Sequence, residues 1–416
     1  MRALPANAMT IQLHHKIGEP EDCDVLVVGA GPAGSACAQM LARAGADVLL
    51  VDRHDFPREK VCGDGLIPDA HHALARLGVL DAVLARARAA SHVVCVAPHG
   101  RRLEVPASLA VLPRRELDEI VRQAAMAAGA RWLAPVRFEA PLVDANGRAA
   151  GARLRLADGS ERPLRARWTV LATGAAAGPL AAADMCSRRA PSGIALRGYV
   201  RNEAMEGRIR QLEVVWHRAL RGGYGWIFPC GDGLFNIGTG WLDRPAGGGP
   251  APHLRELFAA FVRVHAPARE LMQGGSLNGE LKGAPLRCSL EGARVSRPGL
   301  LVTGEAAGST YSFTGEGIGK ALETGMLAAR AIQRAGDDAA VTARYDAALA
   351  ALKPRFAAYA QANRINSHPW IADFVLWRGQ RDPGIVRRLA AVLDESYSPD
   401  RLVTARGLLR MMLPVR

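Results

Sequence analysis

The chain has 416 residues, of which 49% are hydrophobic and 22% are charged, and its formal net charge is +13 at pH 7. These values predict a folded protein with a large core in two closely joined domains, and they exclude a disordered or fibrous chain. No apolar stretch of about 18 residues or more occurs, so we expect no membrane-spanning helix. The basic charge comes without aromatic interleaving or zinc-finger spacing, so we expect no nucleic-acid partner.

The N-terminal segment 1–21 lacks the apolar core of a signal peptide, and we expect it to be a disordered extension. The seven cysteines are odd in number and scattered. They lack the paired spacing of a metal site, so we expect free thiols in a cytoplasmic protein and assign no metal ligands.

The first motif is a glycine-rich turn between a predicted strand at 24–28 and a predicted helix that ends near Gly45. It reads G-A-G-P-A-G, and a second strand follows it and ends at Asp52. This context predicts a dinucleotide-binding site, with the phosphates at the helix N-terminus and the ribose near the acid. The predicted cofactor-binding residues are Gly29, Gly31, Pro32, Ala33, Gly34, Asp52 and Arg53.

The second strand continues into a polar segment at 54–70 that glycine and proline interrupt. Such a segment predicts a functional loop instead of a crossover helix. His54, Glu59 and Asp64 are the titratable residues on this loop that could serve as a base, but we expect each to be solvated. Further along, R-x-x-L-D begins a predicted helix at Arg114.

A second glycine-rich stretch, GEAAGSTYSFTGEGIGKALETG, occupies 304–325, contains six glycines and ends in a predicted helix. Because glycine lowers backbone order unless close approach requires it, this stretch also predicts a ligand contact. Together, G-A-G-P-A-G, R-x-x-L-D and G-E-A-A resemble the p-hydroxybenzoate-hydroxylase-type FAD oxidoreductases, from Cys23 to about Tyr359.

The resemblance implies an α/β fold: a Rossmann-type FAD-binding domain with an inserted β-sheet substrate domain and C-terminal helices. The implied boundaries are 1–21 for the extension; 22–90, 105–180 and 290–335 for the FAD-binding domain; 91–104 and 181–289 for the substrate domain; and 336–416 for the helical region.

The resemblance also implies roles for the later motifs. Gly304 and Glu305 would meet the ribitol or diphosphate of FAD. The turn at Gly315, Gly317 and Ile318 would direct a helix N-terminus at the isoalloxazine and stabilise the reduced flavin anion. The remaining cofactor-binding residues that it implies are Cys62, Gly63, Arg114, Thr173 and Gly174.

Many aromatic hydroxylases of this fold have an Asp-Gly pair where this chain has Thr173-Gly174, and that Asp helps to bind NADPH. The absence of this Asp argues against NADPH binding in the usual way. NAD(P)H stays one candidate electron donor, and a different donor or route stays open.

Two motifs narrow the resemblance to the geranylgeranyl-reductase-like branch. The turn from Lys60 to Gly65 resembles the P-C-G-G turn of reductases for geranylgeranyl groups and menaquinone tails. Y-G-W-I-F-P at 224–229 and G-T-G at 238–240 match a pattern that covers the substrate cavity in those enzymes. Strand alternation places the three aromatic rings on one face, either as an apolar wall over the flavin or as ordinary sheet core.

The candidate catalytic residues are Tyr224, Trp226 and Cys62, although Cys62 could equally be an inert buried thiol. The loop Y-S-F-T at 311–314 differs from the reductases, and the branch also contains monooxygenases of tryptophylquinone biogenesis. The resemblance therefore favours an FAD-dependent monooxygenase that acts on an aromatic or unsaturated substrate, such as a peptide-borne tryptophan, through a flavin C4a-hydroperoxide.

Two alternatives stay open: a C=C reductase of an isoprenoid or quinone tail, and a flavoprotein partner without turnover. The implied partners are a small aromatic or isoprenoid substrate or a polypeptide substrate.

From Ala340 onward the pattern is helical, and Pro354 is expected to kink or restart a helix. The last segment, 401–416, is basic and apolar, and we favour a docked terminal helix there over contact with a membrane.

Overall fold

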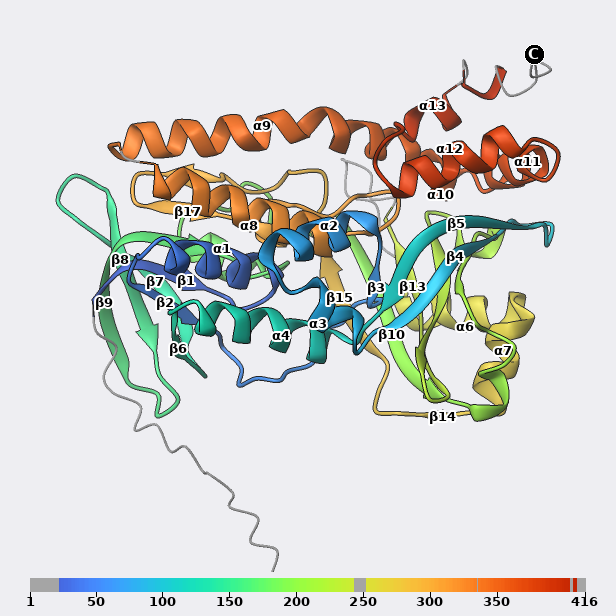
Figure 1. Cartoon of the computed structure of the whole chain (residues 1–416), viewed down its shortest axis with the longest axis horizontal. Helices are drawn as coiled ribbons and strands as arrows, with labels where there is room; N and C mark the ends of the chain where they lie inside the picture. The colour runs from blue at the N-terminus through green and yellow to red at the C-terminus, as the bar shows by residue number, and fades with distance from the viewer. Residues whose placement is uncertain (1–21, 243–251, 335, 405–406, 410–416) are drawn as a thin grey trace, which may run out of the picture.

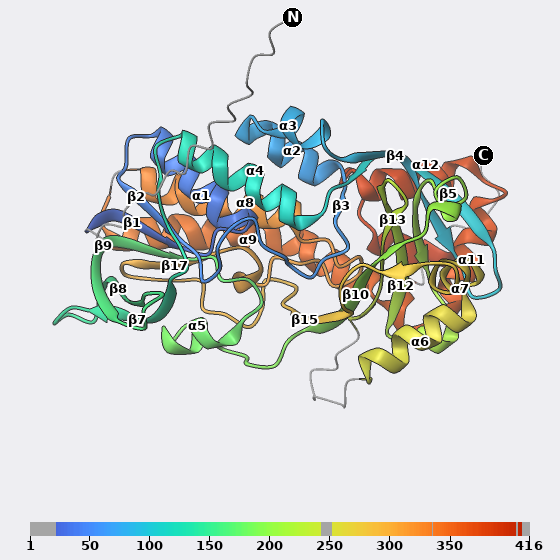
Figure 2. The same ribbon diagram turned by 90° about the horizontal axis from the view of Figure 1, so that it is seen from below.

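The computed structural model describes residues 22–242, 252–334, 336–404 and 407–409, so the predicted extension at 1–21 lies outside them. These residues form an α/β fold of two sheets that lie side by side, with helices packed over both (Figures 1 and 2). The predicted fold class is confirmed.

The first sheet has a parallel centre in which the apolar run at 24–28 becomes the middle strand, β1. Such a strand is buried on both faces, which explains its uninterrupted apolar sequence. The spatial order is β16 (Ser296–Arg297), β17 (Leu300–Val302), β9 (Glu161–Leu171), β1 (Cys23–Val28), β2 (Val48–Val51) and β6 (Arg131–Leu133), and β7 (Arg137–Val143) and β8 (Ala149–Arg155) extend β9 on one side.

Helices cover one face of this sheet, and α1 is in contact with both α4 and α8. Leu26 and Val28 on the other face pack with residues of β8, β9 and α5. The helices of this half are α1 (Pro32–Arg43), α2 (Pro68–Leu77), α3 (Leu80–Leu84), α4 (Arg114–Ala127), α5 (Ala177–Ala182) and α8 (Ile318–Gln333), with the 3-10 turn η3 (Gly304–Ala307).

The second sheet is mainly antiparallel and is built from two parts of the chain. Its spatial order is β14 (Ser276–Leu277), β10 (Gly193–Arg201), β13 (Leu234–Trp241), β12 (Gly223–Gly231), β11 (Leu212–Val215), β4 (Arg88–Val96), β5 (Arg102–Val111) and β3 (Gly65–Leu66), and β15 (Lys282–Leu286) also pairs with β10. Because β5 continues to Val111, the boundary expected after residue 104 falls inside a strand.

Two helices and two short turns complete the second half: α6 (Leu254–Val264), α7 (Ala266–Gln273), η1 (Glu203–Met205) and η2 (Arg218–Leu220). The helices α6 and α7 pack on β10 and β13 through residues that include Phe258 and Phe261.

The C-terminal helices lie over both sheets (Figure 1). They are α9 (Asp338–Ala362), α10 (Arg364–Ser367), α11 (Trp370–Gly379), α12 (Pro383–Leu393) and α13 (Asp400–Val403). Of the two outcomes expected at Pro354, the restart is wrong, because α9 runs through this proline without interruption, and the kink stays a prediction. Pro354 lies on the exposed side of α9, where water can satisfy the carbonyl that loses its helical partner. In the described ranges, no helix combines the length and the apolar character that a membrane crossing needs.

Candidate functional site

The first glycine turn joins β1 to α1 and is very tight. Gly29 has φ +101°, and a Cβ there would lie 2.4 Å from the carbonyl oxygen of Ala172. A Cβ on Gly34 would lie 1.7 Å from the carbonyl oxygen of Gly29, so the approach of helix to strand excludes any side chain. At Gly31 the nearest atom to such a Cβ is 3.6 Å away, so a Cβ there would make only ordinary contacts.

The N-terminus of α1 points toward the space in front of Gly31. No side chain caps this helix, and its first turn contains no acidic residue. Two guanidinium groups flank the space, because Nη2 of Arg58 and Nη2 of Arg114 lie 3.6 and 3.9 Å from the position of a Cβ on Gly31. Free helix amides and two arginines form a site that suits a diphosphate.

A buried ion-pair network holds the two arginines in place. Arg114 donates two hydrogen bonds to Asp118, at 2.7 and 2.8 Å, and Nη1 of Arg58 lies 3.1 Å from the same carboxylate. Arg58 also lies 3.5 Å from Asp52. Burial opposes the charge of Arg114, but the carboxylate of Asp118 outweighs it and raises the pKa of Arg114. Arg58 was missed in the sequence because it stands in an irregular loop.

Asp52 ends β2 beside the first glycine turn. Its carboxylate accepts hydrogen bonds from the backbone N–H groups of Ala30 and His54, at 2.9 and 3.0 Å. A carboxylate has further lone pairs, so these bonds leave room for a ribose hydroxyl. The next residue, Arg53, is exposed.

The second glycine-rich stretch packs directly on the first. Gly304 has φ +64°, and a Cβ on it would lie 2.6 Å from the Cβ of Ala33. A Cβ on Gly325 of α8 would lie 2.1 Å from the carbonyl oxygen of Ala33. Two turns that are far apart in the sequence therefore meet at one place, as the resemblance implies for an FAD site.

Glu305, in this turn, directs its side chain toward Lys60 and Gly174. Its Oε2 is 3.5 Å from Nζ of Lys60 and would be 3.9 Å from a Cβ on Gly174. The neighbouring Thr173 has a buried hydroxyl for which the described residues supply no hydrogen-bond partner. An unsatisfied buried hydroxyl at this position is consistent with a polar ligand group.

The loop at 311–317 leads into α8 and is held by the aromatic strand β12. The hydroxyl of Tyr224 donates a hydrogen bond to the carbonyl of Thr314. Gly315 has φ +70°, and a Cβ there would lie 2.8 Å from the same hydroxyl. A Cβ on Gly317 would lie 2.7 Å from Oγ1 of Thr310, and Ile318 then begins α8. The backbone of this loop is therefore packed too closely for side chains at either glycine.

The aromatic rings of β12 lie along one face, as strand alternation predicts. The ring centroids of Tyr224 and Trp226 are 6.2 Å apart, and those of Trp226 and Phe228 are 6.5 Å apart. Trp226 donates a 2.9 Å hydrogen bond to Asn236, and a Cβ on Gly238 would lie 2.3 Å from its ring. Tyr224 and Trp226 are largely buried, and they form an apolar wall that also belongs to the core.

The turn around Cys62 packs against this wall. A Cβ on Gly63 would lie 3.2 Å from the ring of Phe228, and the carbonyl of Cys62 accepts a hydrogen bond from Asn236 at 2.8 Å. The Cys62 thiol is half-buried and also interacts with the guanidinium of Arg114. The turn thus connects the aromatic wall to the arginine network.

Asp64 corrects one expectation, because it is fully buried and not solvated. Its carboxylate accepts hydrogen bonds from Tyr199 at 2.5 Å and Asn236 at 2.7 Å, and its φ is +66°. Burial raises the pKa of Asp64 to about 6, against the opposing effect of these hydrogen bonds. His54 and Glu59 on the same loop are exposed, as expected.

A cluster of acids surrounds Lys320 in the first turn of α8. The Lys320 side chain is only 4% exposed, and its Nζ lies 2.7 Å from Glu323, 2.9 Å from Glu395 and 3.9 Å from Asp69. Burial raises the pKa of Asp69 to about 7, and burial with the nearby Asp69 raises the pKa of Glu316 to about 8. Sequence reasoning missed this cluster, since its members are scattered between α2 and the C-terminal helices.

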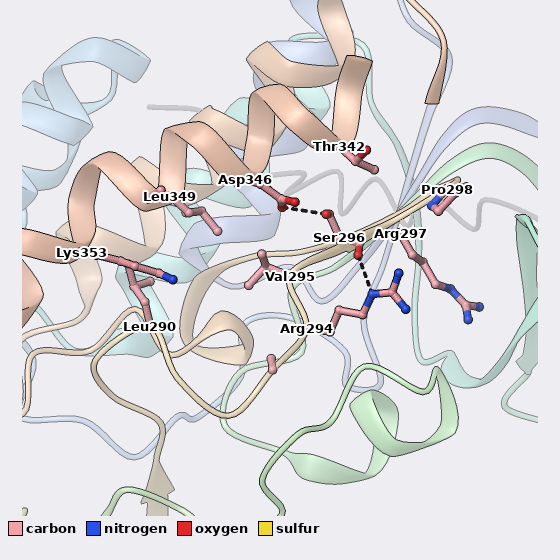
Figure 3. Close-up of a pocket in the computed structure, with 12 residues that line it drawn as sticks. Leu290, Arg294, Val295, Ser296, Arg297, Pro298, Thr342, Asp346, Leu349 and Lys353 are labelled. Carbon is pink, nitrogen blue, oxygen red and sulfur yellow. Dashed lines mark hydrogen bonds between the residues drawn. The ribbon is translucent and has the colours of Figure 1, made fainter. Parts of the chain in front are cut away.

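A separate cavity of about 590 Å³ lies between the 290–298 segment and α9 (Figure 3). Ser296 on its wall donates a hydrogen bond to Asp346 at 2.7 Å, and the guanidinium of Arg294 donates one to the carbonyl of Ser296. None of the predicted site residues lines this cavity. The candidate site is therefore the region where the two glycine turns, the arginines and the aromatic wall meet.

The residues at this site fit FAD. Gly31 lies beside two guanidinium groups without crowding, the N-terminus of α1 is uncapped, and the Thr173 hydroxyl has no partner among the described residues. Comparison with known proteins agrees, because a family model described as an FAD binding domain matches residues 22–194.

Two curated relatives cover most of this chain. A menaquinone reductase of Mycolicibacterium smegmatis is 33% identical over 75% of this chain and 77% of its own length. Digeranylgeranylglycerophospholipid reductase 1 of Methanopyrus kandleri is 30% identical over 73% of this chain and 79% of its own length.

Solved structures share the fold. A geranylgeranyl bacteriochlorophyll reductase-like protein of Thermoplasma acidophilum superposes with a TM-score of 0.70 at 21% identity, covering 94% of this chain and 96% of its own. A flavin-dependent brominase superposes with a TM-score of 0.74 at 16% identity, covering 94% of this chain and 97% of its own.

The fold and the site thus define an FAD-dependent oxidoreductase with the p-hydroxybenzoate-hydroxylase fold. Within that class, the chain belongs to the geranylgeranyl-reductase-like family.

Proposed function

We propose that this protein is an FAD-dependent reductase that adds hydrogen across a C=C bond of an isoprenoid chain, such as the tail of a quinone or lipid. The observation that carries the proposal is the 33% identity to a menaquinone reductase over three quarters of the chain. The sequence alone favoured a monooxygenase because of the loop at 311–314. The relatives support the reductase alternative better, and they give no support to a polypeptide substrate.

The chain's own residues would bind and orient the cofactor and the substrate. Arg58, Arg114 and the amides of α1 would hold the diphosphate, and Asp52 would accept from the ribose. Tyr224 and Trp226 would give the isoprenoid chain an apolar surface and exclude water from it. Bound, reduced FAD supplies a hydride equivalent, and NAD(P)H stays our proposed source of those electrons.

Reduction of a C=C bond consumes one proton for each hydride, and the acids near α8 can store protons. Asp69 has one buried carboxylate oxygen without a partner among the described residues, which favours its neutral form. Burial raises the pKa of Asp69 to about 7 and the pKa of Glu316 to about 8, so near neutral pH Glu316 is mostly protonated and Asp69 is about half protonated. Glu316 stands in the loop next to Tyr224 and is the one that we assign to the substrate side.

Anaerobic turnover tests the proposal. The full chain, loaded with FAD and reduced by dithionite, is mixed with a menaquinone that has an unsaturated tail, and the product is examined by mass spectrometry. We expect a product that has gained one pair of hydrogen atoms without any need for O₂. A product that contains a new oxygen atom and forms only in air would restore the monooxygenase interpretation, and flavin without any turnover would favour a non-catalytic partner.

A further inference from the structure

The helix α11 carries an aromatic stripe on its outer face. Its inner residues, Ile371 and Val375 among them, are buried in the core on the side of α11 that faces β4 and β5. Trp370, Phe374 and Trp377 follow the i, i+4, i+7 spacing of one helix face. Trp370 is 57% exposed. Phe374 and Trp377 are half-buried, with ring centroids 5.9 Å apart, and Phe374 also packs against the core.

Arginines surround this stripe at both ends. The guanidinium groups of Arg378 and Arg381 lie 5.8 and 4.8 Å from the ring of Trp377. At the other end, the exposed Arg221 donates a hydrogen bond to the carbonyl of Ser367, and the exposed Arg218 contacts His99.

The two acids beside the stripe are already engaged. Asp373 accepts from the ring and the backbone N–H of His99, at 2.7 and 3.0 Å. Asp382 caps α12 by accepting from the N–H of Gly384. The four arginines around the stripe outnumber these two acids, so this face carries more positive than negative charge, in line with the charge of +13 on the whole chain.

The stripe is also connected to the candidate site. Asn366, one turn before Trp370, accepts a hydrogen bond from Trp216 at 2.8 Å and donates one to the carbonyl of Phe313 at 3.0 Å. Trp216 continues the aromatic wall, since its ring centroid lies 6.3 Å from that of Tyr224. Contacts therefore run without a gap from the start of α11 through Asn366 and Trp216 to Tyr224.

We propose that α11 docks this protein on the surface of an anionic lipid bilayer, with Trp370 and its neighbours in the interface and the arginines on the lipid headgroups. Tryptophan favours the boundary between water and hydrocarbon, and an amphipathic helix with a basic rim binds anionic lipid. The inference rests on the proposed function for its substrate, because an isoprenoid quinone or lipid resides in the bilayer. Docking at α11 would bring the aromatic wall, which Asn366 connects to the start of α11, close to the bilayer that holds that substrate.

Sedimentation with lipid vesicles tests the docking without any turnover. Wild-type holoenzyme should bind vesicles of equal parts phosphatidylcholine and phosphatidylglycerol, and added salt should weaken the binding. Arg378→Gln combined with Arg381→Gln should reduce binding by about fivefold for each arginine removed. Trp370→Ser should reduce it by about tenfold. The matched control is Leu84→Ser with Arg86→Gln, which changes an exposed leucine and an exposed arginine near α3 and should bind like the wild type.

Three results would overturn the docking proposal. They are no binding of the wild type to the vesicles, equal binding of the wild type to pure phosphatidylcholine, and wild-type binding by both α11 variants. A dimer that buries Trp370 in solution would overturn it as well. A second assay separates this result from the proposed function: Trp370→Ser should keep wild-type turnover of a short-chain isoprenoid quinone in detergent and lose turnover of a long-chain quinone in vesicles. If neither the wild type nor any variant reduces a C=C bond in the tail of either quinone, the proposed function fails. Binding to vesicles in the sedimentation assay would still support the docking proposal.

Discussion

At the scale of single residues, Gly34 and Gly31 of the first glycine turn differ in whether the fold requires a glycine. Gly34 is required by the fold, because any Cβ would overlap the carbonyl oxygen of Gly29. Gly31 has φ −72° and ψ −174°, which any residue adopts, and nothing in the chain blocks a methyl group there. The chain itself does not require glycine at 31, and we propose that a ligand does.

We predict that Gly31→Ala keeps the free energy of unfolding of the apo-protein within about 1 kcal/mol of the wild type and weakens FAD binding at least about tenfold. Gly34→Ala is the contrasting variant, and it should lower the free energy of unfolding by about 2 kcal/mol or more through overpacking. Urea unfolding and fluorescence titration with FAD measure the two effects. Equal FAD affinity in Gly31→Ala and wild type would show that Gly31 does not face the cofactor.

Asp69 leads to a prediction about pH. Burial raises its pKa from 3.8 to about 7 in the folded state, although Lys320 opposes the shift, so folding favours the protonated form. Its stabilising contribution is complete below the unfolded pKa, falls as the pH rises through the folded pKa, and is then lost. Asp69→Asn stays neutral, so its free energy of unfolding relative to wild type should rise by more than about 1 kcal/mol from about pH 4 to about pH 8.

Urea unfolding at both pH values measures this difference, and Asp81→Asn on the exposed side of α3 is the control. The same change in Asp69→Asn and Asp81→Asn would mean that Asp69 is not protonated by folding.

At the scale of elements, the C-terminal helices clamp the loop at 311–317. Tyr311 is fully buried, stacks on Tyr359 of α9 with ring centroids 3.7 Å apart, and donates a 2.7 Å hydrogen bond to Glu395 after α12. Glu395 also accepts from Lys320 and from Arg355. One carboxylate thus joins three elements around the start of α8.

We expect Glu395→Ala to lower the free energy of unfolding by about 3 kcal/mol, since it leaves Lys320 and the hydroxyl of Tyr311 with fewer partners in a buried place. Amide hydrogen exchange in 311–320 should also become faster. The neighbouring variant Asp394→Ala removes an exposed carboxylate and should change neither quantity. An equally small effect of both variants would show that the clamp does not depend on Glu395.

Sequence reasoning succeeded where a motif is local and failed where contacts are distant. The glycines at 29, 31 and 34 stand within one turn, and their spacing alone predicts the geometry. Asp64 was misjudged because its partners Tyr199 and Asn236 lie far along the chain on β10 and β13. The restart expected at Pro354 failed for a related reason, since tertiary packing of Phe356 and Tyr359 stabilises α9 beyond its local propensity.

At the scale of the whole molecule, the FAD site is assembled from segments that span most of the chain. The first turn, the turn at Gly304 and the loop at 311–317, which Tyr224 holds in place, belong to separate parts of the sequence. If FAD joins them as we propose, it should stabilise the entire fold, because it binds only when all three are in place.

We therefore predict that FAD at about 100 times its Kd raises the free energy of unfolding by about 2.7 kcal/mol, with a single shifted thermal transition and a yellow, protein-bound chromophore. Differential scanning calorimetry with and without FAD measures the shift, and riboflavin, which has no diphosphate, is the matched control. Equal shifts with FAD and riboflavin would contradict the roles of Arg58 and Arg114.

The helix α9 contacts both the first sheet and the loop at 311–317. Near its start Tyr345 donates a hydrogen bond to the carbonyl of Val302 in the first sheet, and near its end Phe356 and Tyr359 pack around Tyr311. Consider a hybrid in which all residues after 336 come from a relative. Its C-terminal helices would be shaped to pack against the relative's loop and not against the loop at 311–317 of this chain. Such hybrids should retain flavin only when the donor's counterpart of 311–317 is transferred together with the helices. We therefore expect substitutions in these two segments to occur together among relatives.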